Sequence, residues 1–331
     1  MKGMLPSRPG RGALVTVRVR VFALALAIAI ALTTAQAAHA NSIASVVVAP
    51  DGSIYFSDYV RNRVWKVSSD GKLTAAVTGK HVHHLVVDQN GTLYGEHIPS
   101  GSGGEPSLWE RSADGKVTET FRAVRHGQAL TYPGSVFTID PRGGLEFLRE
   151  CQIVRLNAAG TPEPWAGRRC PGEVFKDAAL RYAHLHGSFA WAANGVLLFS
   201  DARTVRRVLP DGSVTTLRGR PIGLFAPPRP DEIQFDHVMG LVVDPAGNVV
   251  VAERGSRSIR SIDAVGRVRT VFTLSFFASP TGLGNSGSDL YVLTQLRAPT
   301  PGFLAGLVGN PTLRKITPDG RSTVIASPSG R

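Results

Sequence analysis

The sequence predicts an all-β chain folded as a six-bladed β-propeller of four-stranded antiparallel blades. A turn glycine recurs six times beside a short strand pattern, at Gly52, Gly91, Gly143, Gly195, Gly247 and Gly287. A second turn glycine follows each of these, and three successive spacings between Gly91 and Gly247 are each 52 residues. A fixed period containing two hairpins is typical of a repeat architecture with four short strands per unit.

The second strand of each unit is the clearest element. In chain order these strands are expected at residues 53–58, 92–97, 144–149, 196–201, 248–253 and 289–294. They alternate apolar and polar residues or run apolar throughout, as strands do when a sheet is packed on both faces. The outer hairpin of each unit closes at the second glycines, which are Gly71, Gly115, Gly160, Gly212, Gly266 and Gly320. Because helical periodicity is nearly absent, we expect one propeller domain at residues 41–331.

Residues 1–40 lie outside the repeats and are typical of a secretory signal peptide. Five cations and no acidic residue precede or flank the apolar run 21–32, and small residues follow up to Ala40. This order predicts export with cleavage before Asn41, and the apolar run is short for a membrane span. We therefore expect a secreted or periplasmic monomer with no membrane attachment after cleavage. An uncleaved anchor is the alternative.

The charge pattern bears on nucleic-acid binding, and the two cysteines bear on a disulfide. The chain has 37 Lys and Arg against 25 Asp and Glu, and five of the cations belong to residues 1–40. Most others fall on the third strands and their turns, which predicts a solvated basic rim. Aromatic residues do not interleave with these cations, so we expect no nucleic-acid partner. Cys151 and Cys170 flank one hairpin, where an oxidising compartment favours a disulfide over two free thiols.

Two stretches carry a resemblance to a known superfamily: VVVAPDGSIYFSDYVRNRVWKVSSDG at 46–71 and GLVVDPAGNVVVAERGSRSIRSIDAVGRVRTVF at 240–272. They resemble the units of NHL-repeat and gluconolactonase-like six-bladed propellers, and such units cover essentially all of the chain after residue 40. The resemblance implies the fold. It implies no single activity, because this superfamily contains enzymes, receptor modules and interaction scaffolds.

Two positions in each unit are expected to face one mouth of the central channel. The position six residues after the turn glycine gives Asp58, His97, Arg149, Asp201 and Glu253, and by a less certain count Thr294. The position ten residues before the glycine gives Ser42, His81, Pro133 and His237, and also His184 if the fourth turn holds one extra residue. Residues two apart on a strand face the same side, so His81 and His83 would point together.

Imidazoles and carboxylates converging on one axis are ligands that a divalent ion requires. We expect zinc, calcium or magnesium there, with ligands drawn from His81, His184, His237, Glu253, Asp58 and His97. In this hypothesis Glu253 or Asp201 acts as a general base and Arg149 stabilises a developing anion. The alternative is a solvent-filled channel whose polar groups are hydrated or hold turns.

Resemblances to two enzyme families imply which residues would bind the metal. Unit five is similar to the streptogramin-lyase motif, in which an E-P-H-G-like start precedes a strand ending in Glu, and Gly240 and Glu253 match that spacing. His237 replaces the first metal-binding Glu of that family, and Met239 replaces its catalytic His. A looser resemblance to peptidyl-hydroxyglycine amidating lyases implies zinc held by histidines of different blades, here His81, His184 and His237.

The sequence thus favours an exported propeller with a metal at the channel mouth, acting as a hydrolase or lyase on a small molecule. The competing hypothesis is a non-catalytic NHL-type module that binds an extracytoplasmic protein or glycan through loops 218–231 and 298–311. An enzyme requires the channel groups to lie within ligand distance of one another. A binding module requires an exposed apolar or aromatic patch, and the sequence shows no obvious one.

Overall fold

The computed structural model describes residues 44–99, 107–122, 137–149, 152–156, 162–167, 188–200, 204–210, 214–219, 235–297 and 307–328. The chain divides into two compact units, and the propeller belongs to the unit formed by Ser42–Arg297 and Leu307–Arg331. The other unit, Met1–Asn41 with Ala298–Gly306, lies outside the described residues. The signal peptide at 1–40 and the pairing of Cys151 with Cys170 therefore stay predictions.

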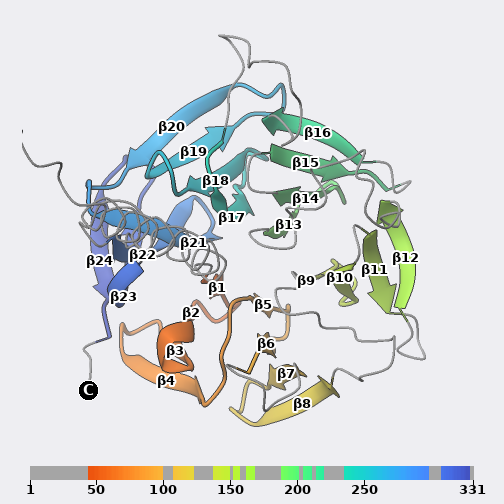
Figure 1. The fold of residues 1–331 in the computed structure, drawn as a ribbon, viewed down its shortest axis with the longest axis vertical. Coiled ribbons are helices and arrows are strands. Elements are labelled where there is room, and N and C mark those ends of the chain that lie inside the picture. The colour runs from red at the N-terminus through yellow and green to blue at the C-terminus, as the bar shows by residue number, and fades with distance from the viewer. Residues whose placement is uncertain are drawn as a thin grey trace, which may run out of the picture. The chain divides into compact units, whose positions relative to one another are not determined.

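The described propeller is all-β, with six four-stranded antiparallel blades around a centre, as predicted (Figure 1). Blade 1 contains β1 (Val46–Val48), β2 (Ile54–Asp58), β3 (Arg63–Val67) and β4 (Leu73–Thr78). Blade 2 contains β5 (Leu85–Val87), β6 (Leu93–His97), β7 (Ser107–Arg111) and β8 (Val117–Arg122). Blade 3 contains β9 (Phe137–Ile139), β10 (Leu145–Arg149), β11 (Gln152–Leu156) and β12 (Pro162–Gly167).

The remaining blades follow in the same way. Blade 4 contains β13 (Phe189–Trp191), β14 (Leu197–Ser200), β15 (Thr204–Val208) and β16 (Val214–Gly219). Blade 5 contains β17 (Val238–Val243), β18 (Val249–Glu253), β19 (Ser258–Ile262) and β20 (Val268–Thr273). Blade 6 contains β21 (Ala278–Ser286), β22 (Asp289–Arg297), β23 (Leu307–Ile316) and β24 (Ser322–Ala326). None of the described residues forms a helix long and apolar enough to cross a membrane.

The strands of each blade pair in chain order, so the first strand is innermost and the fourth is outermost (Figure 1). All six predicted glycines of the inner turns have positive φ, which a residue without Cβ adopts at little cost. The sixth turn differs from the others. Ser286 pairs directly with Asp289 there, whereas the pairing in blade 1 stops at Val48 and Ile54. Thr294 follows its turn glycine by seven residues, one more than the corresponding positions of the other blades.

The core lies between neighbouring blades. Tyr55 and Val64 of blade 1 pack in one cluster with Leu93 and Trp109 of blade 2, and Trp109 is completely buried. Similar clusters join blade 4 to blade 5 and blade 5 to blade 6. Since each blade buries apolar side chains on its neighbours, the blades stabilise one another in series.

The ring closes where the first blade packs on the last. Val46 and Phe56 share a buried cluster with Leu293 and Leu313 of blade 6, and the Ala44 N–H donates to the Thr281 carbonyl at 2.9 Å. Each of the six described blades is built from consecutive strands, so no strand is exchanged between the first and last blades. Side-chain packing between them therefore closes the circle.

Gly282 allows this close approach, and we predict that Gly282→Val destabilises the protein. A Cβ at Gly282 would lie 2.3 Å from the Ala44 carbonyl oxygen, so β1 and β21 must separate. We expect a loss of roughly 2 kcal/mol or more in the free energy of unfolding, measured by urea denaturation. The matched control is Ser286→Ala, an exposed position on the same strand. Equal stability of the two variants would contradict this account of ring closure.

Candidate functional site

The six innermost strands surround a central cavity of about 330 Å³. Each innermost strand begins at one end of this channel and reaches its turn glycine at the other. The predicted site residues that the structure describes belong to the first end, where innermost strands begin and second strands finish. We call it the histidine mouth and define it by residues 58–62, 81–84, 96–98, 236–237 and 253–257.

Two imidazoles meet at the histidine mouth. The sequence predicts that His81 and His83 point together on a strand, but in the structure both precede β5 and belong to no strand. His81 Nε2 lies 3.0 Å from His83 Nε2, with the rings nearly perpendicular. The Nδ1 atom of His81 lies 3.0 Å from the side-chain oxygen of Asn62. Because that oxygen accepts, the His81 proton is placed on Nδ1 and the lone pair on Nε2. The lone pair is therefore aimed at His83.

Asn62 is placed by the turn that follows β2. A single 3-10 turn, η2 (Tyr59–Arg61), ends at Asn62, whose φ of 53° lies in the left-handed region. Asparagine tolerates this conformation better than most residues with a Cβ. The turn thus determines where the amide that orients His81 lies.

Burial favours the neutral form of three imidazoles at this mouth. It lowers the pKa of His81 and of His97, and Lys80 lowers that of His97 further. His84 is more deeply buried, and burial lowers its pKa to about 3. Neutral imidazoles keep an available lone pair, as metal coordination or general-base chemistry requires.

Tyr59 links the histidine pair to other blades. Its ring stacks on His83 with centroids 5.1 Å apart, and its hydroxyl lies 3.4 Å from the side-chain oxygen of Gln295 in blade 6. Burial raises the pKa of Tyr59, and the nearby Arg254 guanidinium opposes that shift. The mouth therefore brings a protonated phenol close to the two imidazoles, and the charge of Arg254 in blade 5 acts on that phenol.

The Glu96 side chain holds the backbone of His83 and His84. Its Oε1 atom accepts the backbone N–H groups of His83 and His84, each at 2.9 Å. Burial raises the pKa of this carboxyl to about 8, against the lowering effect of those two bonds. Glu96 is therefore protonated at neutral pH and positions the two histidines.

The structure gives Asp58 and Glu253 structural partners. Asp58 accepts from Trp65 Nε1 and from Arg61, both at 3.2 Å, and its carboxylate caps η2. Glu253 accepts the Asp236 N–H at 2.8 Å and pairs with Arg260 at 2.9 Å. Both carboxylates are buried in these networks, which fits the alternative in which such groups hold turns.

His97 and His237 also lie apart from the Nε2 pair. His97 Nδ1 accepts the backbone N–H of His81 at 3.0 Å, so it anchors that backbone. His237 occupies the position equivalent to His81, since the two carbonyls accept from Arg254 and Ile98 respectively. Its ring, however, lies 2.6 Å from Asp236 with its side chain about half exposed.

The described part of the chain contains no group of three or more His, Cys, Asp or Glu placed to hold a metal ion. Asp201 and His184 lie outside that part. Arg149 ends β10, but its side chain is not among those described. Thr294 donates its hydroxyl to the Thr312 carbonyl within blade 6. Among the predicted ligands that the structure describes, His81 alone belongs to an imidazole pair, with His83.

An exposed aromatic pair lies at the same mouth, although the sequence showed no obvious patch. Phe276 and Phe277, between β20 and β21, are 70% and 52% exposed and pack edge to face. The Arg257 guanidinium lies 5.1 Å from the Phe276 ring centroid. Neighbouring elements at this mouth add two more exposed apolar side chains, Val60 and Leu296.

The fold and the mouth together define a six-bladed β-propeller with paired imidazoles at one end of its channel. A streptogramin B lyase structure is similar in fold, with a TM-score of 0.53 and 16% identity over 86% of this chain and 82% of that one. Regucalcin from Agrobacterium tumefaciens, described as a calcium-binding protein, gives a TM-score of 0.52 and 15% identity over 77% and 83%. An auxiliary nutrient binding protein from Bacteroides ovatus gives 0.56 and 13% over 76% and 66%.

These similarities confirm the expected resemblance to six-bladed propellers at the level of the fold. No family model matches the sequence, and no curated protein matches it. At such low identity, activity has to be argued from the site itself.

The proton on Glu96 predicts a specific pH dependence of stability. The folded carboxyl keeps its proton up to about pH 8, whereas the unfolded group loses it near 4.5. Stability therefore falls as the pH rises through this range. Glu96→Gln keeps the acceptor for His83 and His84 and removes the titration. Urea denaturation at about pH 5 and about pH 8 should show roughly 2–5 kcal/mol less decline in the variant.

Glu110→Gln, on β7 of the same blade, is the matched control and should keep the wild-type decline. His84 changes the free energy of unfolding in the opposite direction. Its pKa is 6.5 in the unfolded chain and about 3 in the folded protein, so it lowers stability as the pH falls below about 6.5. An unchanged decline in Glu96→Gln would show that Glu96 is ionised in the folded protein.

Proposed function

We propose that this protein is an exported propeller that binds a divalent metal at the histidine mouth and acts as a hydrolase or lyase on a small molecule. The observation that carries the proposal is the approach of His81 Nε2 to His83 Nε2 at 3.0 Å. Export is supported by the basic, apolar and small-residue order of residues 1–40. The similarity in fold to a nutrient binding protein is compatible with an extracytoplasmic location.

The imidazole pair fits half of a metal site. His81 and His83 would hold the ion through their Nε2 atoms, and His83 would then carry its proton on Nδ1 so that both nitrogens offer a lone pair. Asn62 supplies the support that metal-bound histidines usually have, an oxygen that accepts from the other ring nitrogen. Paired imidazoles favour zinc over calcium or magnesium, which prefer oxygen ligands.

A metal in this position would polarise a carbonyl or activate water. The residues around it would do the rest of the chemistry. Tyr59, kept protonated by burial, can donate to an oxygen of a bound substrate. Arg254 of blade 5, whose charge acts on the Tyr59 hydroxyl, would stabilise a developing anion in place of Arg149.

Metal content tests the proposal directly. Mature protein purified without a histidine tag should contain close to one zinc per chain by mass spectrometry. The double variant His81→Ala/His83→Ala should lose it. His237→Ala is the matched control and should retain it, because that ring pairs with Asp236 at the protein surface. Absence of metal from the wild type after zinc addition and dialysis would overturn the metalloenzyme proposal.

Asn62 provides a subtler test of the same site. Asn62→Gly removes the oxygen that orients His81 while tolerating the left-handed backbone. Zinc affinity should fall by about 10–100-fold, measured by competition with a fluorescent chelator. Asn62→Asp keeps an oxygen acceptor and should stay within a few-fold of the wild type. Equal affinity of the glycine variant would show that Asn62 does not orient a ligand.

The second candidate function is a non-catalytic binding module for an extracytoplasmic protein or glycan. The exposed Phe276 and Phe277 favour it, since aromatic side chains are enriched at interaction sites. The metal measurement separates the two functions. A metal-free protein whose partner binding depends on Phe276 and Phe277 would be a module, whereas a zinc protein with turnover would be an enzyme.

A further inference from the structure

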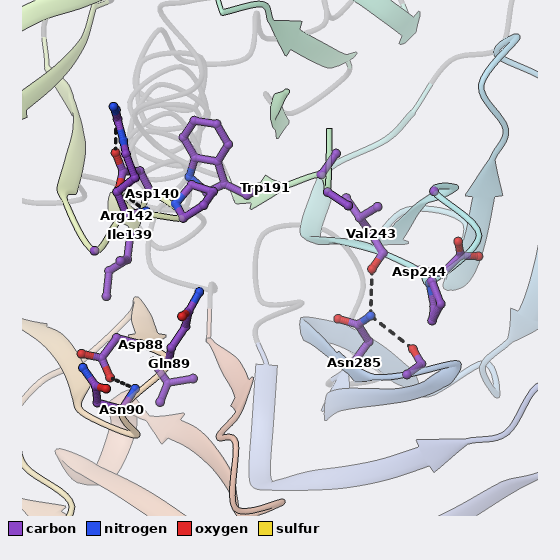
Figure 2. A pocket seen from close by; sticks show the side chains of 18 residues that line it. Asp88, Gln89, Asn90, Ile139, Asp140, Arg142, Trp191, Val243, Asp244 and Asn285 are labelled. Atoms are coloured by element: carbon purple, nitrogen blue, oxygen red, sulfur yellow. Dashed lines mark hydrogen bonds and ion pairs between the residues drawn. The ribbon is translucent and has the colours of Figure 1, made fainter. Parts of the chain in front are cut away.

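We propose that the opposite end of the channel holds a second site, for a neutral saccharide. This end, the turn mouth, is formed by the inner-hairpin turns at residues 88–91, 140–143, 192–195, 244–247 and 285–287. They surround a cavity of about 680 Å³, larger than the 330 Å³ of the central cavity (Figure 2). A cavity of this size accommodates a ligand of drug or oligosaccharide size.

Trp191 gives this cavity an aromatic wall. The indole is partly buried and stacks on Trp165 with ring centroids 5.9 Å apart and an interplanar angle of 20°. Trp165 is held in turn by the Arg155 guanidinium, 3.5 Å from its ring centroid. The stack fixes Trp191 before any ligand arrives, so little side-chain entropy is lost on binding.

Planar polar side chains line the rest of the turn mouth. Gln89 and Asn90 come from blade 2, and Arg142 comes from blade 3, and all three are exposed to solvent. Asn285 of blade 6 donates its amide to the Val243 carbonyl at 2.9 Å, which leaves the amide oxygen as an acceptor (Figure 2). Amide and guanidinium groups offer the donors and acceptors that ligand hydroxyls need.

The charge of the described lining residues favours a neutral ligand over an anionic one. Asp88, Asp140 and Asp244 line the cavity, and Arg142 is the one cation among the lining residues described. Each aspartate accepts backbone N–H groups of its own turn through Oδ1, and Arg142 pairs with Asp140 at 3.3 Å. Three carboxylates against one guanidinium leave a negative mouth, which repels anions.

An aromatic face beside many neutral and planar hydrogen-bonding groups matches the chemistry of a pyranose. The C–H face of a sugar ring packs on an indole, and its hydroxyls bond to amide, carboxylate and guanidinium groups. A second cavity of about 430 Å³ adjoins the first, because Asp140, Pro141, Arg142 and Trp191 line both. Trp165 also lines this second cavity, which gives room for a second sugar ring beside the first.

Binding of neutral trisaccharides tests this inference independently of the metal proposal. Maltotriose, cellotriose, xylotriose and trigalacturonate are titrated into the full protein by calorimetry, each up to about 10 mM. At least one neutral trisaccharide should bind, and trigalacturonate should bind more weakly. Trp191→Ala should reduce affinity by about tenfold or more, the size expected from losing an aromatic contact.

Arg142→Ala and Gln89→Ala keep the test valid if Trp191→Ala fails to fold. Both side chains are exposed, so these variants should melt like the wild type yet weaken saccharide binding by about threefold or more. His81→Ala/His83→Ala and Phe276→Ala are controls at the other mouth and should bind saccharide normally. Failure of every neutral sugar to bind would overturn the proposal. Tighter binding of trigalacturonate, or binding that the turn-mouth variants leave unchanged, would do so too.

Discussion

The structure depends on the burial of both faces of every blade. A four-stranded sheet of this size is not stable when one apolar face meets water, so each blade requires a neighbour on either side. The first and last blades meet this requirement only by packing on each other, through Val46 and Phe56 against Leu293 and Leu313. This packing fixes the innermost strands. The side chains at both ends of the channel are therefore held in defined positions.

The two ends of the channel use that rigidity differently. At the histidine mouth, side chains that follow second strands reach each other across blades, as Tyr59 does toward Gln295. At the turn mouth, short turns hold their own aspartates, and the neighbouring Gln, Asn, Arg and Trp side chains line the cavity. One scaffold therefore carries buried histidines at one end of its channel and exposed polar side chains at the other.

The fold could be predicted from the sequence because turn glycines report backbone conformation directly. The positive φ at Gly52 and at its five counterparts is a local requirement that the sequence shows. The site could be predicted only in part. The sequence predicts that His81 and His83 point together, but both precede β5, so their approach depends on an irregular segment and not on strand alternation. Asn62 and Tyr59 depend on a turn that no periodicity reveals.

The carboxylates show why the remaining site residues could not be predicted. Asp58 and Glu253 occupy the positions expected for ligands, yet each accepts from a residue seven further along, Trp65 or Arg260, across the hairpin. The position of a carboxylate in the repeat does not show whether it can bind a metal or is already hydrogen-bonded to a donor within its own blade. A donor seven residues downstream is the signal that would have separated them.

The absence of an exchanged strand among the described blades has a consequence for the order of the chain. Every blade is a consecutive segment, and the contact between blades 1 and 6 is of the same kind as the other contacts between neighbours. A circular permutant cut between two blades would therefore preserve each sheet intact. The fold therefore depends on which blades are neighbours in the ring, and not on which blade comes first in the chain.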